Sequence, residues 1–244
     1  MFERLFRRKS NQSTQEPFRS QGEGLPLRRN YKSYEEYLRH QAEKLPKMLP
    51  QIERSDLEYE TIIRERYREV ADFSGKNVLC VCARLGGEVR GFKALGALAI
   101  GIDIQPGEHN AHVLYGDLHK LQFPDGVFDA VFTNSIDHVY ELDLFAKEIG
   151  RVMRPDALFY AEIAEAPPTG YEVLDTSDIR PFIARLLLFF DIAWQRKITN
   201  ITTYVHWSGS LLCMNRKAQR ASSMPAKSSS SHETGPDGNH KGSS

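Results

Sequence analysis

Acidic side chains stand at the ends of two apolar segments, where they could bind a ligand rich in hydrogen-bond donors. Asp103 lies at the end of the apolar run LAIGIDI, and Asp117 follows HVLYG. A carboxylate at the end of a buried strand costs free energy unless a partner is present. The diol of a ribose is such a partner for Asp103, because its two hydroxyl donors match two carboxylate oxygens. Capping of the turn near Pro106 and Gly107 is the alternative role.

Further polar residues continue this arrangement along the chain. Asp117 can accept a hydrogen bond from an amino group such as the exocyclic amine of adenine. Asp137 and His138, in NSIDHV, follow the next apolar segment and would face the same cleft. Histidine has an ordinary pKa of about 6.5, which suits it to removing a proton from an acceptor hydroxyl group. A structural or substrate-shaping role is the alternative for His138.

These residues need a scaffold that brings the ends of successive strands together. Residues 78–81 form an uninterrupted apolar run, which is typical of a strand buried on both faces of a parallel sheet. Val89, Phe92 and Leu95 follow at helical spacing. Further strand-like runs occur at residues 98–104, 112–117, 128–134 and 157–164. Ligands of such open α/β sheets bind outside the carboxyl ends of the strands, where the candidate residues stand.

The pattern changes after the fifth strand. Residues 179–187 have the spacing of an amphipathic helix, and two strand-like runs follow it with a short joint around Thr199. Such a joint implies an antiparallel pair, because parallel neighbours need a longer crossover. We therefore expect an α/β fold: a Rossmann-like, mostly parallel, seven-stranded sheet with a reversed final strand and helices on both faces.

Two helices are expected to precede the sheet. Ser33 with Glu36, and Ser55 with Glu58, have the spacing of a capping box, in which each serine begins a helix. The proline-containing stretch 46–50 should separate the two helices. This tyrosine-rich pair either covers the cleft or packs plainly against the edge of the core.

The order of these segments resembles the class I S-adenosylmethionine-dependent methyltransferases, of the small-molecule sort often called type 11. The most specific part is FPDGVFDAVFTNSIDHV followed by a helix and EIGRVMRPDALF. The resemblance is close over about residues 74–164 and extends in outline to residue 214. It implies S-adenosylmethionine as the cofactor and a methyl group transferred to a small-molecule substrate.

The resemblance also implies roles for individual residues. By this likeness Asp103 holds the ribose, Asp117 and Leu118 hold the adenine, and Asn134 with Ser135 lies at the methionine end. The full set of implied cofactor-binding residues is Ala83, Arg84, Gly86, Asp103, Ile104, Asp117, Leu118, Asn134 and Ser135. His138 and Asp137 are the candidate catalytic residues.

The turn after the first strand departs from the family pattern. Where the family has an acidic residue and three glycines, this chain has Cys80, Cys82, Arg84 and Gly86. Without glycine, Cys82 and Arg84 are expected either to take ordinary backbone angles or to narrow the pocket. Three fates are open for Arg84: it binds the methionine carboxylate, projects into solvent, or fills the pocket of a protein that binds no cofactor. Cys80 and Cys82, two apart, are expected on one face of the strand.

Composition excludes several classes of protein. The formal net charge is zero, with 32 basic and 32 acidic residues, so no nucleic-acid partner is expected. Three cysteines argue against a disulfide scaffold and favour a cytoplasmic location. No apolar run is long enough for a transmembrane segment. His109 and His112 lack cysteines to complete a zinc set, so no metal site is expected. The oligomeric state cannot be read from the sequence.

Four parts of the chain differ in composition. We expect a disordered basic arm at residues 1–30, a helical extension at 31–72, a methyltransferase-like domain at 73–215 and a disordered serine-rich tail at 216–244.

Two other functions stay open. One is a non-catalytic interaction module, which the altered turn favours. The other is an NAD-dependent oxidoreductase, against which stand the missing G-x-G-x-x-G sequence and the reversed final strand.

Overall fold

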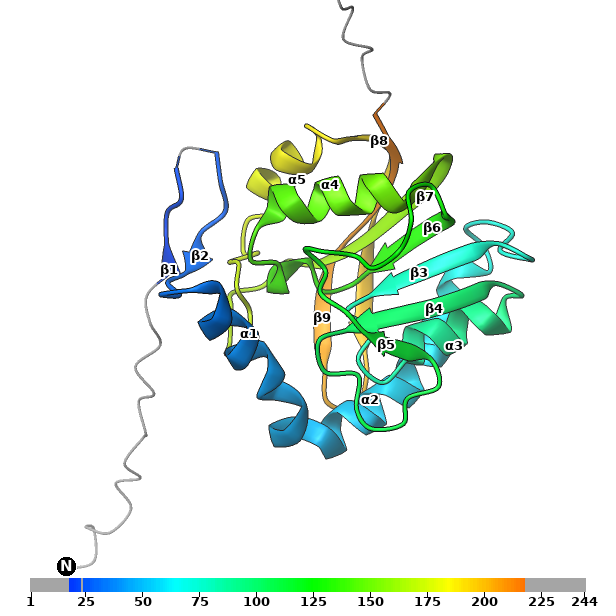
Figure 1. Ribbon diagram of the computed structural model, residues 1–244, viewed down its shortest axis with the longest axis horizontal. Helices are drawn as coiled ribbons and strands as arrows, with labels where there is room; N and C mark the ends of the chain where they lie inside the picture. The colour runs from blue at the N-terminus through cyan, green and yellow to red at the C-terminus, as the bar shows by residue number, and fades with distance from the viewer. Residues whose placement is uncertain (1–17, 23, 218–244) are drawn as a thin grey trace, which may run out of the picture.

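The computed structural model describes residues 18–22 and 24–217, which form a seven-stranded sheet with helices on both faces (Figure 1). The strands of this sheet are β3 (Asn77–Val81), β4 (Leu98–Asp103), β5 (Val113–Tyr115), β6 (Phe128–Thr133), β7 (Met153–Ala164), β8 (Phe190–Ile201) and β9 (His206–Arg216). The helices are α1 (Tyr34–Ala42), α2 (Lys44–Tyr67), α3 (Gly87–Ala94), α4 (Leu142–Val152) and α5 (Arg180–Leu186), with the 3-10 turn η1 (Ile136–His138). A separate pair of short strands comprises β1 (Phe18–Arg19) and β2 (Arg28–Arg29).

The strand order confirms the expected architecture. The sheet runs β5-β4-β3-β6-β7-β9-β8, with parallel pairing from β5 to β7. The last strand, β9, is antiparallel to both of its neighbours. Chain order reverses between β3 and β6, so their carboxyl ends flank the topological switch point at which open α/β sheets bind ligands.

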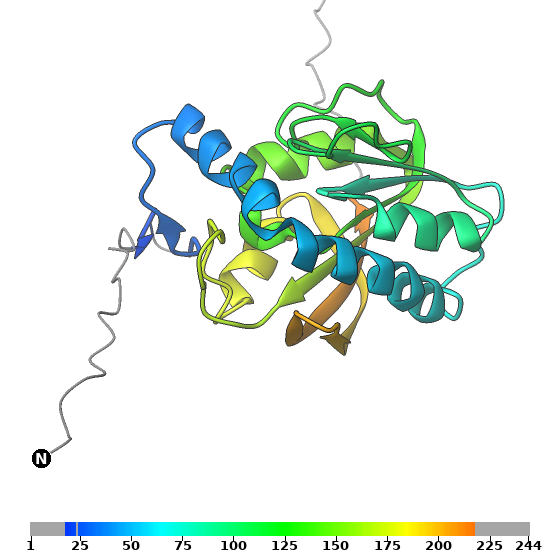
Figure 2. The ribbon, with the colours of Figure 1, turned by 90° about the horizontal axis from the view of Figure 1, so that it is seen from below.

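Burial on both faces explains why the central strands are apolar throughout. Residues 78–81 of β3 are at most 2% exposed. Helices α4 and α5 pack on one face through Ile149 and Phe182, and α2 and α3 pack on the other through Ile63 and Phe92 (Figure 2). Alternate residues of each strand join these two cores, as the two-residue side-chain period of a strand requires.

The two N-terminal helices follow the prediction only in part. Ser33 caps α1 as expected, because its Oγ accepts the N–H of Glu36 at 3.3 Å. The capping box expected at Ser55 is wrong: α2 begins at Lys44, and Ser55 is buried in the middle of it, 3.3 Å from Thr202. The expected break becomes a kink, with a non-helical backbone at Met48. Prolines near the start of a helical turn are tolerated, since the N–H that they lack has no helical acceptor there.

The segment before α1 differs from the disordered arm predicted up to residue 30. Arg19 pairs with Arg28 in the β1–β2 ladder. The guanidinium of Arg28 donates to Glu141 at 2.6 Å and lies over the ring of Tyr140, while Arg29 donates to the Glu172 carbonyl at 3.0 Å. The contacts of these two arginines hold this polar segment in place. Composition alone does not reveal such contacts. The predicted tail beyond residue 217 lies outside the described residues, and within them no helix is long and apolar enough to cross a bilayer.

Candidate active site

A cavity of about 550 Å³ opens at the carboxyl ends of the parallel strands. Its strand side is formed by residues that follow β3, β4, β5 and β6: Cys82, Arg84, Asp103, Ile104, Leu118, Asn134 and Ser135. Its helix side comes from α1, α2, the loop after β7 and the β8–β9 hairpin: Gln41, Lys44, Leu45, Met48, Ile52, Tyr59, Pro167, Tyr171 and Trp207. Asp137 and His138 also line it. This volume lies within the range of about 300–1,000 Å³ that is usual for small-molecule sites.

The structure brings most of the residues predicted from the sequence into this cavity and leaves three outside its walls. Ala83 is buried behind the turn, with its N–H bound to the carbonyl of Ile102 at 3.0 Å. Gly86 is the N-cap residue of helix α3, and Asp117 accepts a hydrogen bond from Tyr34 of helix α1. These three residues can shape the walls but do not line them.

The turn after β3 keeps left-handed backbone angles even where the sequence lacks glycine. The φ angles of Cys82, Arg84 and Gly86 are 61°, 46° and 97°. These angles exclude the first of the two alternatives, ordinary backbone angles at Cys82 and Arg84. A side chain in this region costs about 1–2 kcal/mol per residue, so the surrounding fold must hold the turn in place. Because Cys82 lies beyond the end of β3, it packs with the opposite core from Cys80, which corrects the expected shared face.

Asp103 is held rigidly at the end of β4. Its Oδ2 accepts the N–H of Arg84 at 3.0 Å, and its Oδ1 accepts the N–H of Gln105 at 2.8 Å. Burial raises the pKa of its carboxyl, and the two backbone donors oppose that effect. Each carboxylate oxygen keeps a lone pair for a further donor. The carboxylate is thus oriented and still able to accept hydroxyl groups in the cavity.

Asp117 has a different environment from the one expected. Its Oδ2 accepts the hydroxyl of Tyr34 at 2.5 Å, and its Oδ1 accepts the backbone N–H and ring Nδ1–H of His119 at 2.8 and 3.0 Å. Burial alone would raise the pKa of this carboxyl, but these hydrogen bonds lower it to about 2. Asp117 therefore fastens helix α1 to the sheet, while the next residue, Leu118, reaches the cavity wall.

A buried carboxyl group stands behind the strand side. Glu88 Oε1 accepts the Nδ2–H of Asn134 at 3.0 Å and lies 3.9 Å from Arg84 Nη2. Glu88 Oε2 is buried without a partner among the described residues, and burial raises the pKa of this group to about 7. The guanidinium of Arg84 lies 5.7 Å above the ring of Tyr59. Arg84 therefore lies in the cavity wall, near a carboxyl group that pairs with it only weakly.

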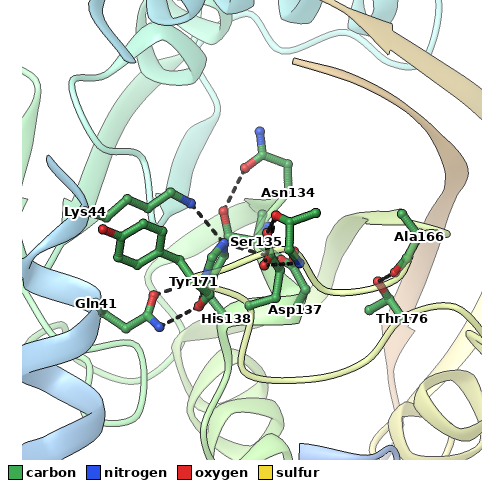
Figure 3. Close-up of polar contacts among 12 residues, drawn as sticks. Gln41, Lys44, Asn134, Ser135, Asp137, His138, Ala166, Tyr171 and Thr176 are labelled. Atoms are coloured by element: carbon green, nitrogen blue, oxygen red, sulfur yellow. Dashed lines mark hydrogen bonds and ion pairs between the residues drawn. The ribbon is translucent and has the colours of Figure 1, made fainter. Parts of the chain in front are cut away.

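His138 is fixed in one tautomer by its neighbours. Its Nδ1 lies 3.0 Å from Gln41 Oε1 and 3.1 Å from the Tyr171 carbonyl, and both of these groups are acceptors (Figure 3). Nδ1 must therefore carry the proton, which leaves the lone pair on Nε2. Lys44 Nζ lies 3.2 Å from this Nε2. Burial, followed by the charge of Lys44, lowers the pKa of His138 to about 4.

Lys44 is a site residue that the sequence reasoning missed. Figure 3 shows it pointing toward His138 from the first turn of α2. Burial lowers the pKa of Lys44, and the neighbouring charge of Arg84 lowers it further. The sequence offers no local sign of this placement, because it depends on α2 beginning at residue 44 and crossing the cavity.

Asp137, His138 and Glu172 place ligand atoms within 4.8 Å of one another, a spacing compatible with a metal ion. The lone pair of His138 already faces Lys44, and Glu172 accepts backbone N–H groups from Thr169 and Gly170. A cation at this point would have to displace the ammonium group of Lys44. The arrangement therefore favours an internal hydrogen-bond network over a metal centre.

Comparison with known sequences identifies one matching family and one curated relative. Residues 79–161 match the family model described as a methyltransferase domain. A fatty-acid O-methyltransferase of Mycolicibacterium smegmatis is 36% identical over 102 residues, which cover 36% of this chain and 37% of the relative. The chain thus aligns with little more than a third of the length of that relative.

Comparison with solved structures identifies the same fold. The Burkholderia thailandensis 1,6-didemethyltoxoflavin-N1-methyltransferase, solved with 1,6-didemethyltoxoflavin and S-adenosylhomocysteine, has a TM-score of 0.58 at 14% identity, over 79% of this chain and 94% of the relative. The PH0226 protein from Pyrococcus horikoshii has a TM-score of 0.52 at 22% identity, over 68% of this chain and 92% of the relative. At these identities the likeness concerns the fold.

Proposed function

We propose that the chain is a class I S-adenosylmethionine-dependent methyltransferase and that it transfers the methyl group of S-adenosylmethionine to a small-molecule acceptor; the match of residues 79–161 to the methyltransferase-domain model supports this proposal. The observation that carries the proposal is the carboxylate of Asp103, clamped by two backbone donors at the end of β4 and facing the cavity. A ribose diol supplies the two hydroxyl donors that this carboxylate can still accept.

The residues on the strand side of the cavity fit the remainder of the cofactor. Arg84 would bind the methionine carboxylate, with which a guanidinium forms two parallel hydrogen bonds. Asn134 and Ser135 would lie at the same end, and Ile104 and Leu118 would enclose the adenosine. The unpartnered Oε2 of Glu88, behind Asn134, supports this fit because it is a buried hydrogen-bond acceptor without a donor, and the ammonium group of the cofactor would supply donors. Asp117 would reach the adenine amine only if Tyr34 shifts, since Tyr34 covers its Oδ2.

The cofactor, when bound, supplies an electrophilic methyl group on a positively charged sulfur. This chain's contribution is to align an acceptor with that methyl group and to exclude water. Helices α1 and α2 close the cavity over the sheet, which serves both purposes. We assign His138 a shaping role instead of proton removal, because its pKa of about 4 and its contact with Lys44 make it a weak base.

The acceptor is proposed to be a small molecule of the lipid or secondary-metabolite kind. Apolar side chains of Leu45, Ile52 and Trp207 on the helix side support an acceptor with an apolar body. The name of the curated relative, a fatty-acid O-methyltransferase, gives independent support for that class.

Calorimetric titration with S-adenosylhomocysteine tests the proposal. We expect micromolar binding by the wild-type protein, and a loss of about 100-fold in affinity for Asp103→Ala, since hydrogen bonds to a buried charged group contribute strongly. Asp191→Ala removes an exposed carboxylate from β8 and should bind as the wild type does. Absence of binding by the wild type would instead favour a non-catalytic module, and preferential binding of NAD would favour an oxidoreductase.

A further inference from the structure

Lys44 is a cation in a mostly apolar wall, and no ion pair among the described residues neutralises it. Its Nζ contacts the uncharged His138 ring at 3.2 Å and lies 5.7 Å from the centre of the Tyr171 ring. The carboxylates of Asp137, Glu172 and Asp103 favour its charged form from a distance, while burial and Arg84 oppose it. A partly desolvated ammonium group without a close counter-ion is costly. The ammonium group of Lys44 is therefore suited to binding an anion.

None of the described carboxylates forms an ion pair with Lys44 within 4.0 Å, and two of the three that favour its charged form are held by backbone donors. Glu172 is bound by the backbone N–H groups of Thr169 and Gly170 in its own loop. Asp103 is bound by the N–H groups of Arg84 and Gln105. An anionic ligand in the cavity would give Lys44 a direct partner.

The chemistry of the site also restricts the acceptor group. An alcohol or phenol acceptor must lose a proton, and His138 is a weak base whose only lone pair faces Lys44. A carboxylate acceptor is already deprotonated at neutral pH. It needs a cation to bind it and no base to activate it.

We propose that Lys44 binds the carboxylate of an apolar carboxylic acid, and that this acid is the methyl acceptor. The inference rests on the proposed function. In the reaction, a carboxylate oxygen donates an electron pair to the methyl carbon as the carbon–sulfur bond breaks. The sulfonium becomes a neutral thioether, the carboxylate becomes a neutral methyl ester, and no proton is transferred. Leu45, Ile52 and Trp207 enclose the apolar part of the acid.

Substitution of Asp137 gives a second test, in which the expected change in affinity for an acid is opposite to that for substitution of Lys44. Its carboxylate lines the cavity and lies 3.9 Å from His138 Nε2, close to the position of Lys44. A bound carboxylate would be repelled by Asp137, whereas an acceptor with an N–H or O–H group would be held by it. Asp137→Asn should therefore preserve or strengthen the binding of an acid and weaken the binding of a hydrogen-bond donor.

The experiment measures the binding of acids and their uncharged analogues to the complex with S-adenosylhomocysteine. Calorimetry would compare decanoate with decanamide and decanol, and naphthoate with naphthamide. We expect the wild-type protein to bind at least one acid about tenfold or more tightly than its uncharged analogues, because truncating a buried charge pair typically has an effect of this size or larger. Lys44→Met should abolish that preference, and Lys44→Arg should retain part of it.

Two controls separate the possible causes of failure. Lys47→Met removes an exposed lysine one turn further along α2, which pairs with Glu43 at 2.5 Å, and should keep the preference for acids. Binding of S-adenosylhomocysteine by Lys44→Met should match the wild type, which shows that the variant is folded. Equal affinity for acids and amides, or an unchanged preference in Lys44→Met, would overturn this inference alone. A wild-type protein that fails to bind S-adenosylhomocysteine would overturn the proposed function and this inference with it.

Discussion

The two sides of the cavity are built in different ways. The strand side comes from residues that follow β3 to β6, all within the segment that matches the methyltransferase-domain model. Most of the helix side comes from α1, α2 and the β8–β9 hairpin, which lie outside that segment. Sheet topology fixes the first side, because strand register sets where each strand ends. The second side depends on elements outside the matched segment, so the two sides of the cavity can be specified separately by the sequence.

The ionisable groups of the two sides shift in opposite directions for one reason. Glu88, behind the strand side, has its pKa raised to about 7, and His138, against the helix side, has its pKa lowered to about 4. Burial is the largest cause in both cases, since it disfavours the charged form of either group. Burial therefore shifts both groups towards their uncharged forms.

Distortion of the strand side should give the largest effect. Gly86 has a φ of 97°, and a Cβ there would lie 2.9 Å from the Cβ of His112. Gly86→Ala combines left-handed strain with this overlap, so we expect a loss of about 3 kcal/mol in the free energy of unfolding. Urea denaturation would measure it. Gly126→Ala is the matched control, because Gly126 has a φ of 63° and nothing within 4 Å of the added atom. A similar loss in both variants would contradict a role for close packing at the turn.

The pH dependence of stability should distinguish the two sides next. His138 has a folded pKa of about 4 against an ordinary value of 6.5, so the native state binds this proton less readily than the unfolded state. Its contribution to the free energy of unfolding should fall by about 2 kcal/mol as pH drops from 6.5 towards 4. The difference between the wild type and His138→Gln over this window isolates the effect. His206→Gln, which removes an exposed histidine, should leave the profile unchanged.

Glu88 should give the opposite slope. Its folded pKa of about 7 exceeds the ordinary value of 4.5, so the native state binds this proton more readily. Relative to Glu88→Gln, the wild type should lose about 2 kcal/mol of stability as pH rises from 4.5 through 7. If the contributions of Glu88 and His138 to the free energy of unfolding changed with pH in the same direction, the opposite pKa shifts of these two groups would be refuted.

Relief of backbone strain should give the smallest effect. Cys82 has a φ of 61°, so Cys82→Gly removes left-handed strain but adds flexibility to the unfolded chain. We expect a gain of about 0.5 kcal/mol in the free energy of unfolding, measured by urea denaturation. Cys80→Gly, in the regular backbone of β3, should instead destabilise the protein. A loss of stability in Cys82→Gly comparable to that in Cys80→Gly would show that the turn is not strained.

Sequence patterns predicted the strand side better than the helix side. The apolar run before Asp103 specified both a buried strand and a carboxylate at its end, and the two final runs specified a reversed edge. Backbone angles at Cys82 and Arg84 could not be predicted, because tertiary structure imposes them against local preference. Lys44 could not be predicted either. Its position depends on a helix that begins at Lys44 and continues through two prolines and a kink. Local capping signals instead predict that this helix begins eleven residues later, at Ser55.

A crystal structure of the protein with S-adenosylhomocysteine tests the central claim most directly. We expect the ribose hydroxyl groups to lie within hydrogen-bonding distance of the Asp103 carboxylate. We also expect the guanidinium of Arg84 to pair with the carboxylate of the ligand. A cavity filled by the Arg84 side chain, with no ligand density beside Asp103 at saturating concentration, would contradict the claim.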